Sequence, residues 1–172
     1  MLSANYYSYV KVIDDDGVFY QFITKHSIGY TVYFRLYEYS KYVNNFPLLL
    51  QKGYSFGLRK QKFDDSKRNI NDIKVFSTIY NIVADFFSDY GKDVILLYHC
   101  DFSDKRQAHR NKLFDLWEKN VLSENTISKY SVEVQIGHDD FYLGFISLND
   151  NPLIEEIKSE FAEFSYFIIQ PK

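Results

Sequence analysis

The chain has 172 residues, of which 23 are acidic and 20 are basic, so its formal net charge is −3. This length can bury a hydrophobic core of its own, and we expect residues 1–172 to form a single domain. The near balance of charges excludes a globally basic nucleic-acid-binding protein and a highly charged disordered chain. The lone cysteine, Cys100, excludes an internal disulfide framework and disfavours a zinc site with several cysteines.

Aromatic residues are unusually frequent. Tyrosine and phenylalanine each number 16, and aromatic residues make up 19% of the chain. Lysine is also abundant, whereas arginine occurs only five times. This composition is typical of an AT-rich genome, and on that interpretation most of the rings fill the core. The alternative interpretation is an aromatic binding surface.

The first part of the chain has the pattern of an antiparallel sheet. We predict strands at about 7–13, 18–24, 30–37 and 54–60, where β-branched and aromatic residues dominate. Asp16-Gly17 lies between the first two strands and predicts a tight hairpin, because both residues accept a positive φ. Pro47 argues against a regular central strand in the stretch 38–52, to which we assign no element.

A helix and a buried strand follow. Apolar residues recur at three- and four-residue spacing from Ile73 to Phe87, which predicts an amphipathic helix that ends at Gly91. The continuous apolar run Val94–Tyr98 predicts a strand that is buried on both faces. The residues able to cap the start of the helix are Asn69, Asn71 and Asp72.

The last part of the chain completes an α+β pattern. We predict a helix over about 105–119, and a hairpin of strands 131–136 and 141–148 around residues 137–140. A final helix begins at Asp150 or Asn151 with Pro152 in its first turn, and an edge strand is expected over 166–169. The predicted inner face of that helix consists of Ile154, Ile157, Phe161 and Phe164. The order of elements predicts an α+β domain with a mainly antiparallel sheet and about three helices.

No targeting or membrane signal is visible. The first seven residues lack the basic and apolar regions of a signal peptide, and no apolar run reaches the length of about 20 residues that spans a bilayer. We therefore expect a cytoplasmic protein without a membrane partner.

One segment concentrates rare residue types between the strand at 94–98 and the helix at 105–119. A loop that leaves a buried strand and enters a helix is a frequent anion position, because free backbone N–H groups and the helix dipole favour negative charge. The candidate ligand-binding residues, here called the 101–110 cluster, are Asp101, Asp104, Arg106, Gln107, His109 and Arg110.

Helical spacing places Arg106 and Arg110 on the same side as Trp117, toward the core. A partly buried arginine needs a partner, which can be a ligand anion or a neighbouring carboxylate such as Asp101 or Asp104. The cluster is therefore either an anion site or a structural ion-pair network. As a third possibility, the two aspartates share a divalent metal.

The segment also resembles a known family. It reads Asp101-x-x-Asp104-x-Arg106-Gln107-x-x-Arg110, followed by Phe114 and Trp117. This pattern, the aromatic N-terminal hairpin and the strand at 142–146 are similar to a family of small bacterial proteins known only as a domain of unknown function. The resemblance implies a bacterial protein of one domain and implies no activity.

Two functional hypotheses follow. The first is a non-catalytic binding module for an anionic small molecule or a protein partner, with no cofactor and no metal. The second is a metal-dependent phosphoester hydrolase or nuclease, in which Asp101 and Asp104 hold the metal and His109 and the arginines stabilise charge. Oligomeric state is left open.

Two further patterns have simpler explanations. Cys100 beside His99 or His109 could act as a thiol nucleophile, but a cysteine at the end of an apolar strand is typically buried and inert. From 52 to 74 there are seven basic and three acidic residues, interleaved with rings such as Tyr54 and Phe56. Alternation in a strand with one buried face explains these rings, so nucleic acid is not the expected partner.

Overall fold

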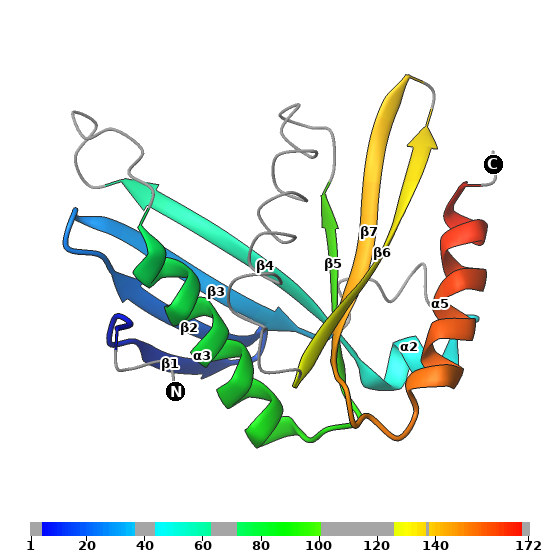
Figure 1. Cartoon of the computed structure of the whole chain (residues 1–172), viewed down its shortest axis with the longest axis horizontal. Coiled ribbons are helices and arrows are strands. Elements are labelled where there is room, and N and C mark those ends of the chain that lie inside the picture. The colour runs from blue at the N-terminus through cyan, green and yellow to red at the C-terminus, as the bar shows by residue number, and fades with distance from the viewer. Residues whose placement is uncertain (1–4, 37–43, 63–71, 101–125, 137, 170–172) are drawn as a thin grey trace.

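The computed structural model describes residues 5–36, 44–62, 72–100, 126–136 and 138–169. These residues carry seven strands and three helices (Figure 1). The strands are β1 (Val10–Asp14), β2 (Gly17–Ile23), β3 (Ile28–Arg35), β4 (Gly53–Lys62), β5 (Ile95–Cys100), β6 (Ile127–Ile136) and β7 (Asp139–Leu148). The helices are α2 (Pro47–Lys52), α3 (Ile73–Tyr90) and α5 (Ile154–Ile169).

All seven strands belong to one sheet, in the order β1-β2-β3-β4-β5-β7-β6. Five neighbouring pairs are antiparallel, and only β4 and β5 are parallel. A parallel pair needs a crossover connection, and α3 lies in the connection between these two strands. The α+β fold class with a mainly antiparallel sheet is therefore confirmed.

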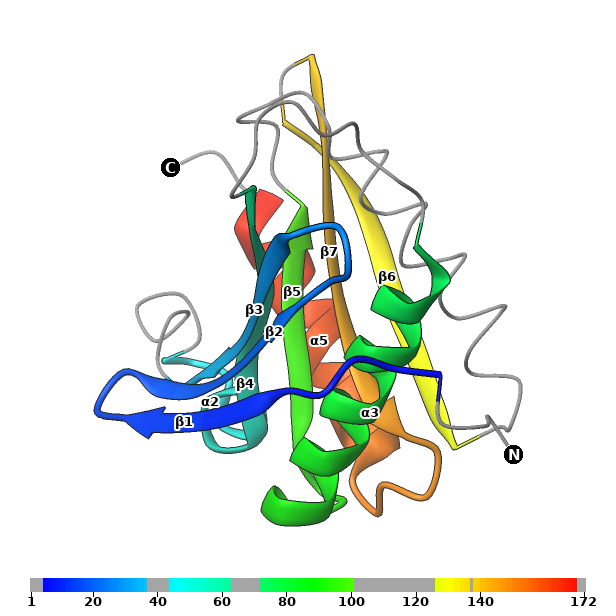
Figure 2. The ribbon, with the colours of Figure 1, turned by 90° about the vertical axis from the view of Figure 1, so that its left-hand side faces the viewer.

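Helix α3 covers one face of the sheet (Figure 2). Its residues Ile82, Val83 and Phe86 are fully buried against the inward side chains of β2, β3, β4 and β5. Phe86 stacks on Phe34 of β3 with ring centres 4.0 Å apart. The rings of Tyr20, Phe22 and Phe56 also belong to this core.

Helices α2 and α5 pack on the other face, over β5 and β7. Ile157, Phe161 and Phe164 of α5 are buried there, as the predicted helix face requires. Strand β5 lies between the two layers, with Leu96 facing α3 and Leu97 facing α5. Both are at most 2% exposed, which confirms the prediction of a strand buried on both faces.

Local signals placed several element ends correctly. Asp14 Oδ1 accepts hydrogen bonds from the backbone N–H groups of Asp16 and Gly17, which closes the β1–β2 turn. Gly17 has a φ of +147°, which L side chains rarely adopt. The carboxylate of Asp72 caps α3 by accepting from the backbone N–H of Lys74, and Gly91 ends the helix.

The stretch 38–52, to which no element was assigned, contains helix α2, with Pro47 at its first position, where a missing N–H costs nothing. Two predictions about elements need correction. Residues 166–169 continue α5 and form no edge strand, since Ile168 keeps the helical spacing from Phe161 and Phe164 and packs on the same core. The hairpin turn is shorter than predicted, since Asp139 already pairs with Ile136.

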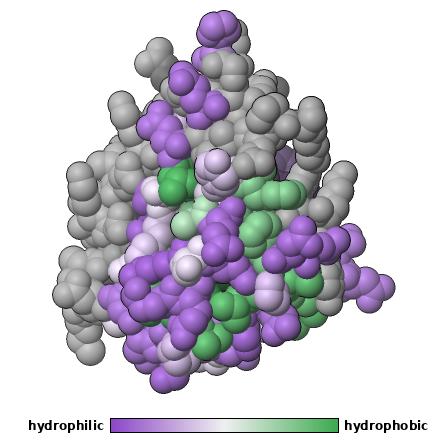
Figure 3. All heavy atoms as spheres, turned by 90° about the vertical axis from the view of Figure 1, so that its right-hand side faces the viewer, coloured by the Kyte–Doolittle hydropathy of each residue, from purple (hydrophilic) through white to green (hydrophobic). Residues whose placement is uncertain are grey.

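The predicted helix over 105–119 lies outside the described residues. Within the described part, no helix combines the length and apolar character needed to cross a membrane. Seen from the side of α5, the described surface is mostly hydrophilic, and apolar side chains show only as separate areas (Figure 3).

Candidate functional site

The 101–110 cluster lies outside the described residues, so the structure does not test it. The candidate ligand-binding residues Asp101, Asp104, Arg106, Gln107, His109 and Arg110 therefore remain predictions. Strand β5 ends at Cys100, which pairs with Tyr142 of β7. The cluster thus directly follows a buried strand, as its sequence context predicted.

A different surface stands out among the described residues. Side chains of β1–β4 that do not face α3 point to the opposite side of the sheet, where α2 and α5 lie over β5 and β7. No described helix packs over the β1–β3 part of this side, which we call the open face. The open face carries Val10, Val12, Phe19, Gln21, Ile23, Thr31, Tyr33, Arg35, Arg59 and Gln61.

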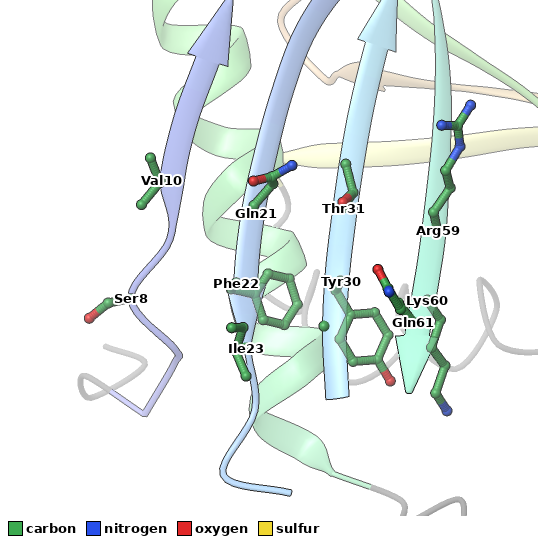
Figure 4. A pocket seen from close by; sticks show the side chains of 11 residues that line it. Ser8, Val10, Gln21, Phe22, Ile23, Tyr30, Thr31, Arg59, Lys60 and Gln61 are labelled. Atoms are coloured by element: carbon green, nitrogen blue, oxygen red, sulfur yellow. The ribbon is translucent and has the colours of Figure 1, made fainter. Parts of the chain in front are cut away.

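Strand register arranges the open face in rows across the sheet. One row runs through Val10, Gln21, Thr31 and Arg59, each directly opposite the next (Figure 4). The row toward the end of β4 runs through Ile23, Gly29 and Gln61. The row on the other side consists of Val12, Phe19, Tyr33 and Gly57.

The first two rows border a hollow of about 830 Å³. Gly29 has no side chain and therefore lowers the floor between Ile23 and Gln61. Gln21, Thr31 and Arg59 place an amide, a hydroxyl and a guanidinium along the hollow (Figure 4). This arrangement offers several hydrogen-bond donors beside an apolar wall.

The N-terminal segment from Tyr7 to Lys11 forms that wall, because alternate side chains of the segment bind to α3 and its cap. Three side chains of this segment bind three aspartates of α3 and its cap. The pairs are Tyr7 with Asp72 (2.6 Å), Tyr9 with Asp85, and Lys11 with Asp89 (2.6 Å). Ser8 and Val10 lie between them in the chain and therefore point away from α3, toward the hollow.

These contacts shift the pKa values of the groups involved. Burial and then the hydrogen bond to Asp72 raise the pKa of Tyr7, and the same two causes, with Asp85 as acceptor, raise that of Tyr9. The hydrogen bond to Asp89 raises the pKa of Lys11. Burial also raises the pKa of Tyr30, whose strand forms the floor of the hollow. The anchoring tyrosines are thus neutral donors across the physiological range.

Next to the hollow, two arginines lie against one ring. The guanidinium carbons of Arg35 and Arg59 lie 5.0 and 5.3 Å from the centre of the Tyr33 ring. Arg35 also lies 5.6 Å from the centre of the Phe19 ring. The Tyr33 ring leans over Gly57, where a Cβ atom would come within 2.1 Å of its Cζ and Oη atoms. Gly57 therefore provides the space that the ring occupies.

These arginines have no carboxylate partner in the described part of the chain. The ion pairs of that part involve Lys11, Lys52, Lys92 and Lys158. The Nε atom of Arg35 is buried and, among the described residues, has no hydrogen-bond partner. Stacking on rings, rather than pairing with acids, thus holds the Arg35 guanidinium in place.

The sequence pattern does not identify this surface. Strand alternation correctly predicts that the neighbouring rings belong to the core, since Phe56 is 5% exposed and Tyr54 packs on Phe86 and Tyr90. Alternation within β3 and β4 also indicates that Tyr33 and Arg59 face the other side. Their contact depends on strand register, for which the sequence contains no direct signal.

The described residues that line the hollow offer hydroxyl, amide, guanidinium, amine and apolar groups. None of these described residues brings a carboxylate, an imidazole or a thiol to the lining. Within the described ranges, no three His, Cys, Asp or Glu side chains gather where they could share a metal ion. The arrangement is chemically suited to binding an anion through arginine and neutral donors.

Comparison with known proteins identifies a family. No curated protein and no solved structure matches the chain. A family model described as a family of unknown function, DUF6169, matches residues 71–163, which is more than half of the 172 residues. The match spans α3 to most of α5, including the 101–110 cluster, whereas the open face precedes it. The chain therefore belongs to this family of unknown function.

Proposed function

We propose that this chain is a non-catalytic binding module, formed by a single domain, that holds an anionic ligand on its open face. The observation that carries the proposal is the placement of Arg35 and Arg59 against Tyr33, with no carboxylate partner among the described residues. A guanidinium group forms planar, forked hydrogen bonds that match phosphate and carboxylate groups.

The amino-acid composition indicates that these two positions need arginine and not simply a cation. The chain uses lysine three times as often as arginine, yet both arginines of β3 and β4 stand on the same face. A lysine would satisfy a requirement for solubility alone. The two guanidinium groups instead lie against a ring, and Arg59, which is exposed, can direct its N–H groups to an anion.

The 101–110 cluster is a second candidate position for the same function. It follows the buried strand β5 and supplies Arg106 and Arg110. The alternative function, a metal-dependent phosphoester hydrolase, also uses this segment, through Asp101 and Asp104. The experiment below therefore includes variants of both segments and a metal.

The test is a titration of the full chain with inorganic pyrophosphate, followed by NMR of the arginine side-chain Nε–H groups. We expect the signal of Arg59 to shift, and Arg59→Ala to weaken binding by about tenfold, the loss of one charge-assisted hydrogen bond. Lys92→Ala is the matched control, since Lys92 is an exposed cation in the turn after α3. It should leave the affinity unchanged.

Each outcome has a defined meaning. Binding that is lost in Arg110→Ala but retained in Arg59→Ala would move the anion site to the 101–110 cluster. Binding that requires Mg²⁺ and disappears in Asp101→Asn would favour the hydrolase. If pyrophosphate shifts no arginine signal in the wild-type chain, the binding function proposed here is wrong.

A further inference from the structure

The open face combines a cation, a ring and neutral donors in a fixed order. Arg59 and Thr31 occupy one row, and Tyr33 occupies the adjacent row. We infer that the ligand is a nucleotide unit, whose phosphate binds Arg59 beside the hollow and whose base stacks on the group formed by Tyr33 and Arg35. This inference rests on the proposed anion-binding function and specifies its ligand.

Arg59 is the better phosphate position of the two arginines. It lines the hollow together with the donors of Thr31 and Gln61 (Figure 4). Arg35 instead lies at the other end of β3, close to Gly17 and the acidic β1–β2 turn. Negative charge in that turn repels a phosphate, so the anion is favoured at the Arg59 end.

Tyr33 and Arg35 provide the position for a planar base. The Tyr33 ring is half-buried over Gly57, and the Arg35 guanidinium lies within 5.0 Å of the ring centre. Aromatic rings and guanidinium planes are the groups on which nucleobases stack in proteins. A ligand with a phosphate but no ring, or a ring but no phosphate, would use only half of this surface.

Two glutamine side chains add hydrogen-bonding groups to the open face. Gln21 stands in the same row as Arg59 and Gln61 in the neighbouring row, and both are exposed. An amide offers donors and acceptors together, which suits the polar edge of a base or a ribose hydroxyl. The side chains of an acidic peptide, by contrast, offer these amides only acceptors and bring no ring to stack on Tyr33.

The experiment compares adenosine monophosphate with ribose 5-phosphate, which has the same sugar and phosphate without the base. We expect adenosine monophosphate to bind about fivefold to 100-fold more tightly, because one stacked base contributes on that order. Tyr33→Leu should reduce this ratio to near one. Tyr33→Phe should preserve the ratio, and Tyr166→Leu, which changes an exposed tyrosine of α5, is the matched control.

A second variant guards against a folding defect in Tyr33→Leu. Gly57→Ala keeps the ring but moves it, because the new Cβ atom would lie only 2.1 Å from Cζ and Oη of Tyr33. The displaced atoms are the far end of a side chain, so the sheet can remain intact. This variant should also lower the ratio between the two ligands.

The outcomes separate this inference from the function on which it rests. Equal binding of the two ligands, or a phosphotyrosine peptide that binds as well as adenosine monophosphate, overturns the nucleotide inference and leaves anion binding in place. Absence of binding by every phosphate ligand overturns both. A short oligothymidylate that binds more tightly than the mononucleotide would identify a single strand as the source of the nucleotide unit, whereas the opposite order would identify a free nucleotide.

Discussion

Tyr9→Phe tests how the N-terminal wall of the hollow is held. The substitution removes only the hydroxyl group that donates to Asp85, while the ring can keep its contact with Tyr20, 5.8 Å between centres. A hydrogen bond to a carboxylate contributes about 1.5–3 kcal/mol when shielded and less at the surface. Since Tyr9 is half-buried and Asp85 is exposed, we expect a loss of about 1 kcal/mol in the free energy of unfolding.

Two measurements quantify this loss. A change of that size lowers the Tm of a chain of this length by about 2–4 °C. It should also speed amide hydrogen exchange in β1 by about fivefold if β1 opens locally from α3. Tyr6→Phe is the matched control, because the exposed ring of Tyr6 stands next to the segment and should leave stability within about 0.5 kcal/mol of the wild type.

The same pair makes a prediction about alkaline pH. Burial, followed by the hydrogen bond to Asp85, raises the pKa of Tyr9 above its ordinary value of 10.0. The stabilisation by this group is therefore complete below that value and decreases as the pH rises above it, because the unfolded chain ionises first. The alkaline loss should be smaller in Tyr9→Phe. A double-mutant cycle with Asp85→Ala that gives simple additivity would refute the contact as the cause.

Two other substitutions test the frame around the open face. Gly17→Ala should destabilise the chain by about 1–3 kcal/mol in urea unfolding, since φ is +147° and the Cβ atom would come within 2.3 Å of the Phe34 carbonyl oxygen; a neutral result would show that the turn relaxes freely. The hydrogen bond from Lys52 lowers the pKa of Asp93 below 3.8, so this pair stabilises the fold above that pH and the effect decreases as the pH falls. Lys52→Met should therefore lower the free energy of unfolding by at most about 1 kcal/mol, because the pair is so exposed, and this loss should become smaller in acid. A loss that stays constant with pH would contradict this explanation.

Most of the fold could be predicted from local signals. Helix α3 is indicated within one short segment by its wide apolar stripe, the Asp72 cap and Gly91. The burial of β5 is likewise indicated by its own apolar run. Each of these features depends on near neighbours in the chain. The C-terminal tail was misassigned because Tyr166 and Phe167 are exposed aromatic residues on a helix, and such residues also favour strands.

The candidate site was less predictable, for a different reason. The 101–110 cluster is contiguous in sequence and therefore easy to single out, but it lies outside the described residues. The open face is built from residues that are far apart in the chain and meet only through the register of β1–β4. A shift of β4 by one residue would turn Arg59 toward α3 and bring Leu58 to the hollow.

Register also explains why Gly57 belongs to the site although it has no side chain to bind a ligand. It stands directly opposite Tyr33, and only an unsubstituted Cα leaves room for the ring to lean across β4. That position brings the ring within reach of Arg35 along β3 and of Arg59 along β4. Gly57 thus sets the position of the ring relative to the two arginines. A ligand that binds both Arg59 and the Tyr33 ring must match the distance between them.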